Sequence, residues 1–489
     1  MENNASTPAH VVIFPQPAQG HVKPMLNLAE LLCLSDVEVT FLVTAQIHHS
    51  LVNYSDTVAR FGRYPGFGFK VVPDVRPTKE WLSYDHIQLM NSMVEGLAVN
   101  AKPLLEDMLS HNETTRVTCL IADGWYSFVH DVANEAGVPV ISCCCAGASS
   151  LWSFFCIPWL FDAGQLPFQV SATEVAVMKF QSQKRSGGDE VADELNVPGM
   201  DAFLRYRDLP SFCRTKDKDS CLRLQQTCAT EAERTKEAYG LILNTFEDLD
   251  GPTLSLFRSQ CKRVYSIGPF DALLKHKLPQ ESAALINASG SLSVVDQTVF
   301  KRDELMEIWE GLVQSNKYFM WAIRPDLIKS NDGDFKTSEA LLEGPKERGW
   351  VVSWAPQEAV LAHPATGGFL THSGWNSTIE SITAGVPMIC LPYFADQQVN
   401  SRYVGEVWKV GLDMKDIYDR NVVAEMVNDM LDGKKDEVQK SMAKMSDAAK
   451  KSVAEGGSSY CNLESLIQDI KMMSFKGEHE VSELSALKE

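Results

Sequence analysis

The chain alternates short apolar runs with segments of helical periodicity through both of its halves. In the first half, the apolar runs span residues 11–14, 37–43, 69–72, 118–122 and 138–141. In the second half, they span residues 318–323, 350–353, 368–371 and 388–390. Strands that alternate with helices form mostly parallel sheets covered by helices. We therefore predict an α/β fold with two Rossmann-like, doubly wound domains.

The length of 489 residues also indicates two domains, because it exceeds the chain length that a single hydrophobic core usually supports. We predict an N-terminal domain over 1–265, an interdomain linker with a degenerate first strand over 266–290, and a second domain over 291–455. The stretch 271–282 is polar and contains a proline, which is typical of a linker. Ligands of doubly wound sheets bind beyond the carboxyl ends of the strands, so we expect the site at those ends.

Composition excludes several classes of function. A formal net charge of −19 argues against nucleic-acid binding, which depends on clustered Lys and Arg. The N-terminus is polar and predicts no signal peptide, and the apolar stretch 143–161 is interrupted by serines and Pro158, which favours a buried helix over a membrane span. The 12 cysteines form no CxxC pair, so we predict no metal or redox motif and expect thiols in a cytoplasmic protein.

Two residues at predicted strand ends suit proton transfer. His21 follows the strand 11–14 at the start of a helix, where the positive end of the helix dipole keeps imidazole neutral, as a general base requires. Asp123 follows the strand 118–122 and would orient the histidine and stabilise its cation. The alternative is that His21 only begins a helix and that Asp123 is a helix N-cap.

The segment 354–397 contains aromatic, histidine, amide and carboxylate groups but no lysine or arginine. Its strand 368–371 is followed by the tight turn 372–374 and a helix that begins near 375–377. Such a helix start directs backbone N–H groups and a positive dipole end at one point, which favours a bound anion.

Each residue of this segment also has a purely structural interpretation. Ser377 and Glu380 have the spacing of a capping box, which would stabilise a helix start without a ligand. Trp354 could fill a core, since tryptophan is highly buried on average. Asp396 and Gln397 could begin an ordinary solvated helix.

The segment 354–397 resembles, without a gap, the signature box of the plant secondary-product UDP-glycosyltransferases. The sequence Gly20 to Met25 is similar to the region around that family's catalytic histidine, and Asp123 matches its orienting aspartate. The resemblance implies the inverting GT-B fold, with two domains facing across a cleft, and a C-terminal helix over 456–475 that crosses back to the first domain. We expect a frayed tail over 476–489.

The resemblance also implies roles for individual residues. Trp354 would stack on uracil, while Gln357 and Glu380 would contact the ribose. The remaining implied contacts to the UDP-sugar are Ala355 and Gly374; His372, Asn376 and Ser377 at the diphosphate; and Trp375, Asp396 and Gln397 at the sugar. Glutamine at position 397 is typical of a preference for glucose.

The resemblance weakens over 279–291, where the expected buried strand is short and contains Asn287. Ser291 is carried over as a candidate diphosphate contact. This stretch is compatible with a natural variant that folds, an altered gene model or weakened donor binding. A non-catalytic or impaired UDP-sugar-binding homologue is therefore the rival hypothesis. A nicotinamide oxidoreductase ranks third, because no GxGxxG follows the first strand.

The acceptor is expected to be a small hydrophobic molecule, such as a terpenoid, iridoid, flavonoid or other phenolic compound, that presents a hydroxyl or carboxyl group to His21. The candidate pocket residues are Trp125, Phe128, Cys145 and Phe394, with a core role as the alternative for each of them. We predict a monomeric UDP-glucose-dependent glucosyltransferase that needs no cofactor, no metal ion and no nucleic-acid or membrane partner.

Overall fold

The computed structural model describes most of the chain. The described residues are 8–76, 86–110, 116–166, 195–200, 204–214, 217–279, 300–323, 328–329, 348–415, 417–433 and 435–486. Contacts divide the chain into two compact units. The first unit comprises Met1–Phe155, Leu222–Val295 and Ala449–Glu489, and the second comprises Cys156–Cys221 and Asp296–Ala448.

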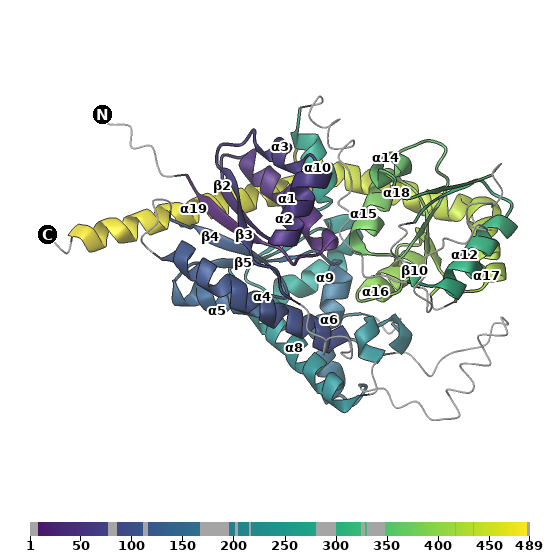
Figure 1. The fold of residues 1–489 in the computed structure, drawn as a ribbon, viewed down its shortest axis with the longest axis horizontal. Coiled ribbons are helices and arrows are strands. Elements are labelled where there is room, and N and C mark those ends of the chain that lie inside the picture. The colour runs from purple at the N-terminus through teal and green to yellow at the C-terminus, as the bar shows by residue number, and fades with distance from the viewer. Residues whose placement is uncertain are drawn as a thin grey trace. The chain divides into compact units, whose positions relative to one another are not determined.

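The first unit is built on a parallel sheet with the strand order β3-β2-β1-β4-β5-β6-β7 (Figure 1). Its strands are β1 (His10–Phe14), β2 (Glu38–Thr44), β3 (Phe67–Val72), β4 (Cys119–Asp123), β5 (Val140–Cys144), β6 (Gly240–Leu243) and β7 (Val264–Ser266). Residues Val11, Val12, Ile13 and Phe14 of β1 pair in register with Cys119 to Ala122 of β4, so β1 and β4 end at the same edge of the sheet.

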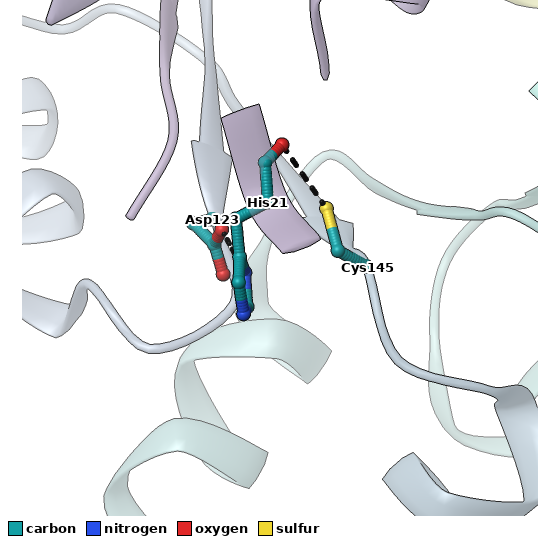
Figure 2. Close-up of side chains that lie close together, drawn as sticks. All are labelled: His21, Asp123 and Cys145. Carbon is teal, nitrogen blue, oxygen red and sulfur yellow. Dashed lines mark hydrogen bonds and ion pairs between the residues drawn. The ribbon is translucent and has the colours of Figure 1, made fainter. Parts of the chain in front are cut away.

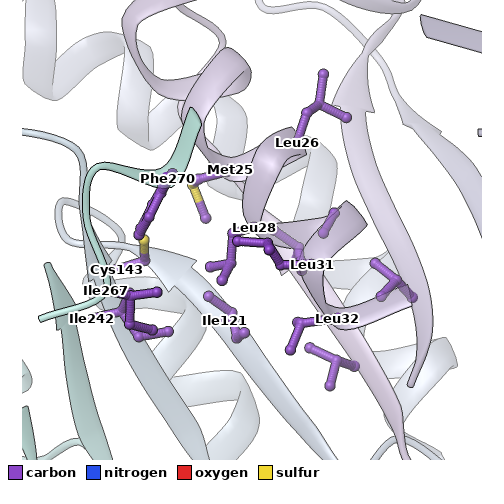
Figure 3. Close-up of a cluster of buried hydrophobic side chains, with 14 of the residues drawn as sticks. Met25, Leu26, Leu28, Leu31, Leu32, Ile121, Cys143, Ile242, Ile267 and Phe270 are labelled. Carbon is purple, nitrogen blue, oxygen red and sulfur yellow. The ribbon is translucent and has the colours of Figure 1, made fainter. Parts of the chain in front are cut away.

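Helices cover both faces of this sheet, which explains why β1, β4 and β5 are buried along their whole length. The helices are α1 (Gln19–Cys33), α2 (Ala45–Tyr54), α3 (Thr57–Phe61), α4 (His86–Leu109), α5 (Ser127–Glu135), α6 (Ala148–Asp162), α8 (Lys218–Glu237), α9 (Glu247–Gln260), α10 (Phe270–Lys277) and α19 (Ser458–Ala486). One face packs on α1, α10 and α19, as Leu28 of α1 over Ile121 illustrates (Figure 3). The other face packs on α4 and α5.

The second unit has shorter parallel strands. The described strands pair as β8 (Phe300–Lys301) with β10 (Ile328–Lys329), β9 (Phe319–Ala322) with β11 (Gly349–Val352), and β12 (Phe369–Thr371) with β13 (Met388–Cys390) and β14 (Gly411–Asp413). The helical segments are η3 (Tyr206–Asp208), η4 (Ser211–Arg214), α12 (Arg302–Gln314), α14 (Gln357–Leu361), α15 (Trp375–Ala384), α16 (Gln397–Arg402), η6 (Tyr403–Val407), α17 (Arg420–Asn428), η7 (Asp429–Gly433) and α18 (Lys435–Val453).

The predicted α/β class with parallel sheets is confirmed, and each predicted apolar run contains or overlaps a strand. The sequence analysis missed β6, β7, β8, β10 and β14, which are two to four residues long and therefore too short to show a period. The stretch 143–161 holds the end of β5 and most of α6. No described helix is long and apolar enough to cross a membrane, and all twelve cysteines are thiols.

The structure differs from the predicted domain boundaries. Residues Cys156–Cys221 belong to the second unit, although we placed them in the N-terminal domain. Residues 270–277 of the predicted linker form α10, whose Phe270 and Leu274 are buried in the core of the first unit. The stretch 271–282 could look like a linker because only one face of α10 is apolar.

The predicted C-terminal tail is also helical, because α19 continues to Ala486. Its residues Leu463, Leu466, Ile467 and Ile470 lie in the core of the first unit. Beyond Phe475 the sequence consists mainly of good helix formers, with Gly477 as the one strong exception, so the helix continues past its packed part.

Candidate active site

His21 and Asp123 meet at the carboxyl edge of the first unit's sheet. His21 is the third residue of α1, and its backbone N–H donates to Ala18 O at 3.0 Å. Asp123 is the last residue of β4, next to β1 in the sheet. The distance from His21 Nδ1 to Asp123 Oδ2 is 2.7 Å (Figure 2). Two residues about a hundred positions apart in sequence thus form one pair.

The surroundings of Asp123 define which group accepts and which donates. Its Oδ2 accepts the backbone N–H of Gln16 at 3.2 Å in addition to the contact with His21. As a carboxylate oxygen it accepts from Nδ1–H, which leaves Nε2 as the proton-accepting nitrogen of a neutral ring. The side chain of Asp123 is 1% exposed and that of His21 is 26% exposed. The carboxylate is therefore held inside while the imidazole reaches the surface.

Tyr126 fixes the two loops that carry this pair. Its hydroxyl donates to Pro15 O at 3.2 Å, and its backbone N–H donates to Asp123 O at 3.2 Å. The Tyr126 ring lies 5.0 Å from the ring of Phe14 and is buried. Asp123 is not the N-cap of α5, since that position is Tyr126. The capping interpretation of Asp123 is therefore wrong.

Glu231 of α8 is a residue near the pair that the sequence analysis missed. Its Oε1 accepts the backbone N–H of Ser127, the first residue of α5, at 3.3 Å. Burial raises the pKa of Glu231 to about 7, and the nearby charge of Asp123 adds to that effect. The surrounding helix is strongly polar, so Glu231 gives no signal in the sequence that distinguishes it from its solvated neighbours.

Cys145 follows β5 and lies beside the same pair. Its Sγ donates to the backbone oxygen of His21 at 3.8 Å (Figure 2). A hydrogen bond with Cys143, together with burial, holds the pKa of the Cys145 thiol well above its usual range. His21, Asp123 and Cys145 offer one ligand atom each, and these atoms lie within 4.8 Å of one another. The sequence predicted no metal-ligand cluster, because these residues are far apart along the chain.

In the second unit, Gln357 contacts two other residues that the resemblance assigns to the UDP-sugar: Glu380 at the ribose and Ser377 at the diphosphate. Its Nε2 donates to Glu380 Oε2 at 2.8 Å and to Ser377 Oγ at 3.1 Å. The N-cap of α15 is Gly374, so Ser377 lies inside the helix and does not cap it. The capping-box interpretation is therefore wrong. Trp354 is 43% exposed, which also excludes a core role for its ring.

The turn between β12 and α15 places His372 against a glycine. A Cβ at Gly374 would lie 2.4 Å from His372 Nε2, so only glycine leaves room for the imidazole there. Ser373 is buried with a φ of 64°, and its carbonyl accepts from Asn400 Nδ2 at 2.9 Å. This bond offsets part of the cost of the left-handed backbone. Ala355, in the loop after β11, and Asn376, the second residue of α15, are both partly buried.

The three predicted sugar contacts, Trp375, Asp396 and Gln397, all have partners within the second unit. The Trp375 side chain is 4% exposed and packs on Trp408, with ring centroids 6.0 Å apart, so its ring does not form a surface for a sugar. Gln397 is buried, and its Oε1 accepts the backbone N–H groups of Tyr393 and Phe394. It is thus not part of a solvated helix start. Asp396 Oδ2 accepts from the Asn400 amide at 2.9 Å.

The predicted acceptor residues are divided between the two units. Phe128 is buried in a core cluster beside Phe14 and Tyr126, so the core interpretation holds for its side chain. Trp125 is partly buried, with its ring 5.1 Å from Phe154. Phe394 lies in the second unit, with its ring centroid 6.4 Å from that of Phe212. Ser291 and most of the unusual stretch 279–291 lie outside the described residues.

Comparison with known proteins identifies the family. Residues 212–447 match the family model of UDP-glucoronosyl and UDP-glucosyl transferases. A 7-deoxyloganetic acid glucosyl transferase of Catharanthus roseus is 43% identical over 95% of this chain and 98% of its own. The chain belongs to the plant family 1 UDP-glycosyltransferases. It is an enzyme of the glucosyltransferase class. A myricetin 3-O-rhamnoside 1,2-glucosyltransferase of Crocosmia x crocosmiiflora is 37% identical over 95% of this chain and 96% of its own.

Solved structures show the same fold. A UDP-glucosyltransferase of Polygonum tinctorium aligns with a TM-score of 0.70 at 24% identity, covering 96% of this chain and 100% of its own. A Medicago truncatula enzyme solved with UDP-glucose aligns with a TM-score of 0.68 at 25% identity, covering 95% of this chain and 98% of its own. The glycosyltransferase therefore has the GT-B architecture predicted for it.

Proposed function

We propose that the enzyme transfers glucose from UDP-glucose, with inversion, to a hydroxyl or carboxyl group of a small hydrophobic acceptor of the iridoid class. Two Catharanthus roseus relatives that are 43% identical act on 7-deoxyloganetic acid, according to their names, and a third relative at 34% identity acts on 7-deoxyloganetin. Other relatives act on a flavonoid glycoside and on mandelonitrile. Iridoids are thus the acceptor class that the most similar of these relatives favour.

The single observation that carries the mechanism is the 2.7 Å contact between His21 Nδ1 and Asp123 Oδ2. In our proposal, Nε2 of the neutral His21 removes the proton of the acceptor hydroxyl, and the buried Asp123 carboxylate stabilises the imidazolium that forms. The acceptor oxygen then attacks the anomeric carbon from the face opposite UDP, which inverts its configuration. A carboxyl acceptor would already be ionised near neutral pH, so its transfer would depend less on His21.

In the second unit, we propose that the nucleotide and sugar are bound by residues of the segment 354–397. The exposed Trp354 ring offers a stacking surface for uracil, and Glu380, oriented by Gln357, would accept the ribose hydroxyls. The start of α15 and His372 would stabilise the charge on the departing diphosphate. Gln357, Glu380, Asp396 and Gln397 are already held by hydrogen bonds, so part of the binding geometry exists before the ligand arrives.

The proposal is tested by incubating the enzyme with UDP-glucose and either 7-deoxyloganetic acid, 7-deoxyloganetin or a phenol, with UDP release and product mass as readouts. We expect UDP release that depends on the acceptor, and a glucoside with the β configuration, measured by the anomeric coupling constant in proton NMR. Binding of UDP-glucose without transfer to any acceptor would instead support the rival hypothesis of an impaired UDP-sugar-binding homologue.

A further inference from the structure

The cluster of His21, Asp123 and Cys145 contains a third chemical group that the proposed mechanism does not use. Cys145 Sγ contacts the backbone oxygen of His21, and the Asp123 carboxylate contacts the imidazole of His21 through Nδ1 (Figure 2). The three ligand atoms lie within 4.8 Å of one another, and this is the one group of its kind found within the described part of the chain. All three residues belong to the first unit, so the cluster does not depend on how the two units are placed.

The size of the cluster suits a metal ion. For any three atoms that lie within 4.8 Å of one another, there is a central position at most about 2.8 Å from each atom, where an ion could sit. Zinc ligands lie about 2.0–2.1 Å away for imidazole nitrogen, about 2.0–2.2 Å for carboxylate oxygen and about 2.3 Å for sulfur. Side-chain shifts of about 0.5–0.8 Å per ligand therefore bring the three atoms to bonding distance. Such shifts are small compared with a change of rotamer.

The ligand set indicates which ions would be selected. Sulfur and imidazole nitrogen prefer Zn²⁺ and similar soft or borderline ions, whereas Mg²⁺ and Ca²⁺ require sets of oxygen ligands. Three protein ligands leave a fourth position for water or an acceptor group, as in open zinc sites. His21 is 26% exposed, which gives an ion a route to a cluster whose other two members are buried.

We propose that His21, Asp123 and Cys145 form a binding site for a thiophilic divalent cation such as Zn²⁺, and that the bound ion inhibits glucosyl transfer. Binding forms metal bonds to a ring nitrogen, a carboxylate oxygen and sulfur, and it releases the thiol proton to solvent. An ion on Nε2 occupies the proposed base directly. An ion on Nδ1 displaces the proton shared with Asp123, and the neutral ring then carries a proton on Nε2, so that Nε2 can no longer accept the proton of the acceptor. The inhibitory half of this proposal rests on the proposed function of His21.

Binding is tested without any activity measurement by titrating the full-length enzyme with Co²⁺ in a buffer without chelator. A thiolate ligand on Co²⁺ produces a charge-transfer absorption band in the near ultraviolet. We expect a band that saturates at one ion per chain, disappears in Cys145→Ser and weakens in His21→Ala. Cys144→Ser is the matched control, because it removes a neighbouring buried thiol and should leave the band intact. No band in the wild type, or an equal band in Cys145→Ser, would overturn the site.

Inhibition is tested separately with Zn²⁺ and UDP-glucose, with each variant normalised to its own rate without metal. We expect Zn²⁺ to inhibit the wild type and Cys144→Ser, EDTA to reverse the inhibition, and Cys145→Ser to need about tenfold or more Zn²⁺ for the same effect. If Co²⁺ binds as expected while Zn²⁺ leaves transfer unchanged, the proposed role of His21 fails and the metal site stands. If Zn²⁺ inhibits Cys145→Ser as strongly as the wild type, the cluster is not the inhibitory site.

Discussion

The two units hold their predicted site residues in different ways. In the first unit, β1, which precedes His21, and β4, which ends at Asp123, are buried along their whole length, and backbone N–H groups and a tyrosine fix the pair. In the second unit, β9 and β11 are half exposed, and Trp354 presents much of its ring to solvent. This difference supports our proposal that the first unit supplies a rigid reactive pair, whereas the second offers a surface that a nucleotide completes. Substitutions should therefore lower kcat in the first unit and raise KM in the second.

The largest expected effect is on Asp123→Asn, which keeps the size of the side chain but removes its charge. The amide cannot stabilise an imidazolium, and one of its orientations favours the wrong tautomer of His21. We expect kcat to fall about 10²–10⁴-fold with an alcohol acceptor, while KM for UDP-glucose changes little. Asp131→Asn, on the exposed side of α5, is the matched control and should keep its rate. A fall in kcat of less than about threefold for Asp123→Asn would show that the carboxylate takes no part.

The next effect concerns stability and a buried ion pair of the second unit. Lys415 Nζ donates to Asp208 Oδ1 at 2.5 Å and to Gln398 O at 2.9 Å. Burial alone would raise the pKa of Asp208, but Arg205 and Lys415 hold it at about 2. Lys415→Met should therefore cost about 3 kcal/mol in urea unfolding, because it leaves a buried carboxylate with fewer partners.

The control for this prediction is Lys317→Met, which breaks the ion pair with Asp432 at the surface of the same unit. Exposed pairs contribute about 0–1 kcal/mol, so this variant should unfold close to the wild type. Equal losses for the two variants would show that burial of the charge does not determine the cost.

An effect of similar or smaller size is expected from the protonation of His130, which lies in the first unit. Burial, with a contribution from Arg234, lowers the pKa of His130 from 6.5 to about 4. At position 130 the unfolded chain then binds a proton that the folded chain does not, so the contribution of His130 to stability falls as pH decreases from about 6.5 to 4. Glu231 contributes with the opposite sign, because its raised pKa makes the folded chain hold a proton that the unfolded chain has lost. The loss from His130 approaches about 3 kcal/mol at the lower end. This loss of stability is measured by amide hydrogen exchange in β5, because Ser142 of that strand contacts His130. His130→Asn should remove this contribution and so change the pH dependence relative to the wild type, and an unchanged slope would contradict the assignment.

The smallest effect is expected for Glu380→Gln in the second unit. Glu380 accepts from Gln357 and is proposed to accept from the ribose, so the amide should raise KM for UDP-glucose about tenfold and leave kcat within about twofold. Glu406→Gln, at an exposed pair with Arg402, is the control and should change neither constant. A lower kcat at constant KM would remove the contrast between the two units.

Local sequence patterns were enough to predict most of the described strands, including β1 and β4, which carry the site in the first unit. The run before His21 and the run before Asp123 are continuously apolar, as buried parallel strands require, and strand ends of one sheet share an edge. The class of the fold followed from this alternation. The pairing of His21 with Asp123 was expected from those rules and from the family resemblance, and the two side chains do lie together.

Contacts between distant segments could not be predicted from local patterns. Glu231 resembles any other acidic residue of a polar helix until the fold places it at Ser127. Cys145 belongs to a run of three cysteines, and only the path of the chain after β5 brings it to His21. Trp375 was assigned by its place in the box, yet its ring turns toward Trp408 because the first turn of α15 faces the core. Alternation gives the strands, but it does not give the direction of each side chain at a loop or helix start.

The central claim is that His21 is the base for an alcohol acceptor, and His21→Ala tests it most directly. The measurement compares single-turnover transfer from UDP-glucose with the affinity for UDP-glucose in the same preparation. The account predicts that transfer falls about 100-fold or more while UDP-glucose affinity stays within about threefold of the wild type. Transfer by His21→Ala at a rate comparable to the wild type would contradict it.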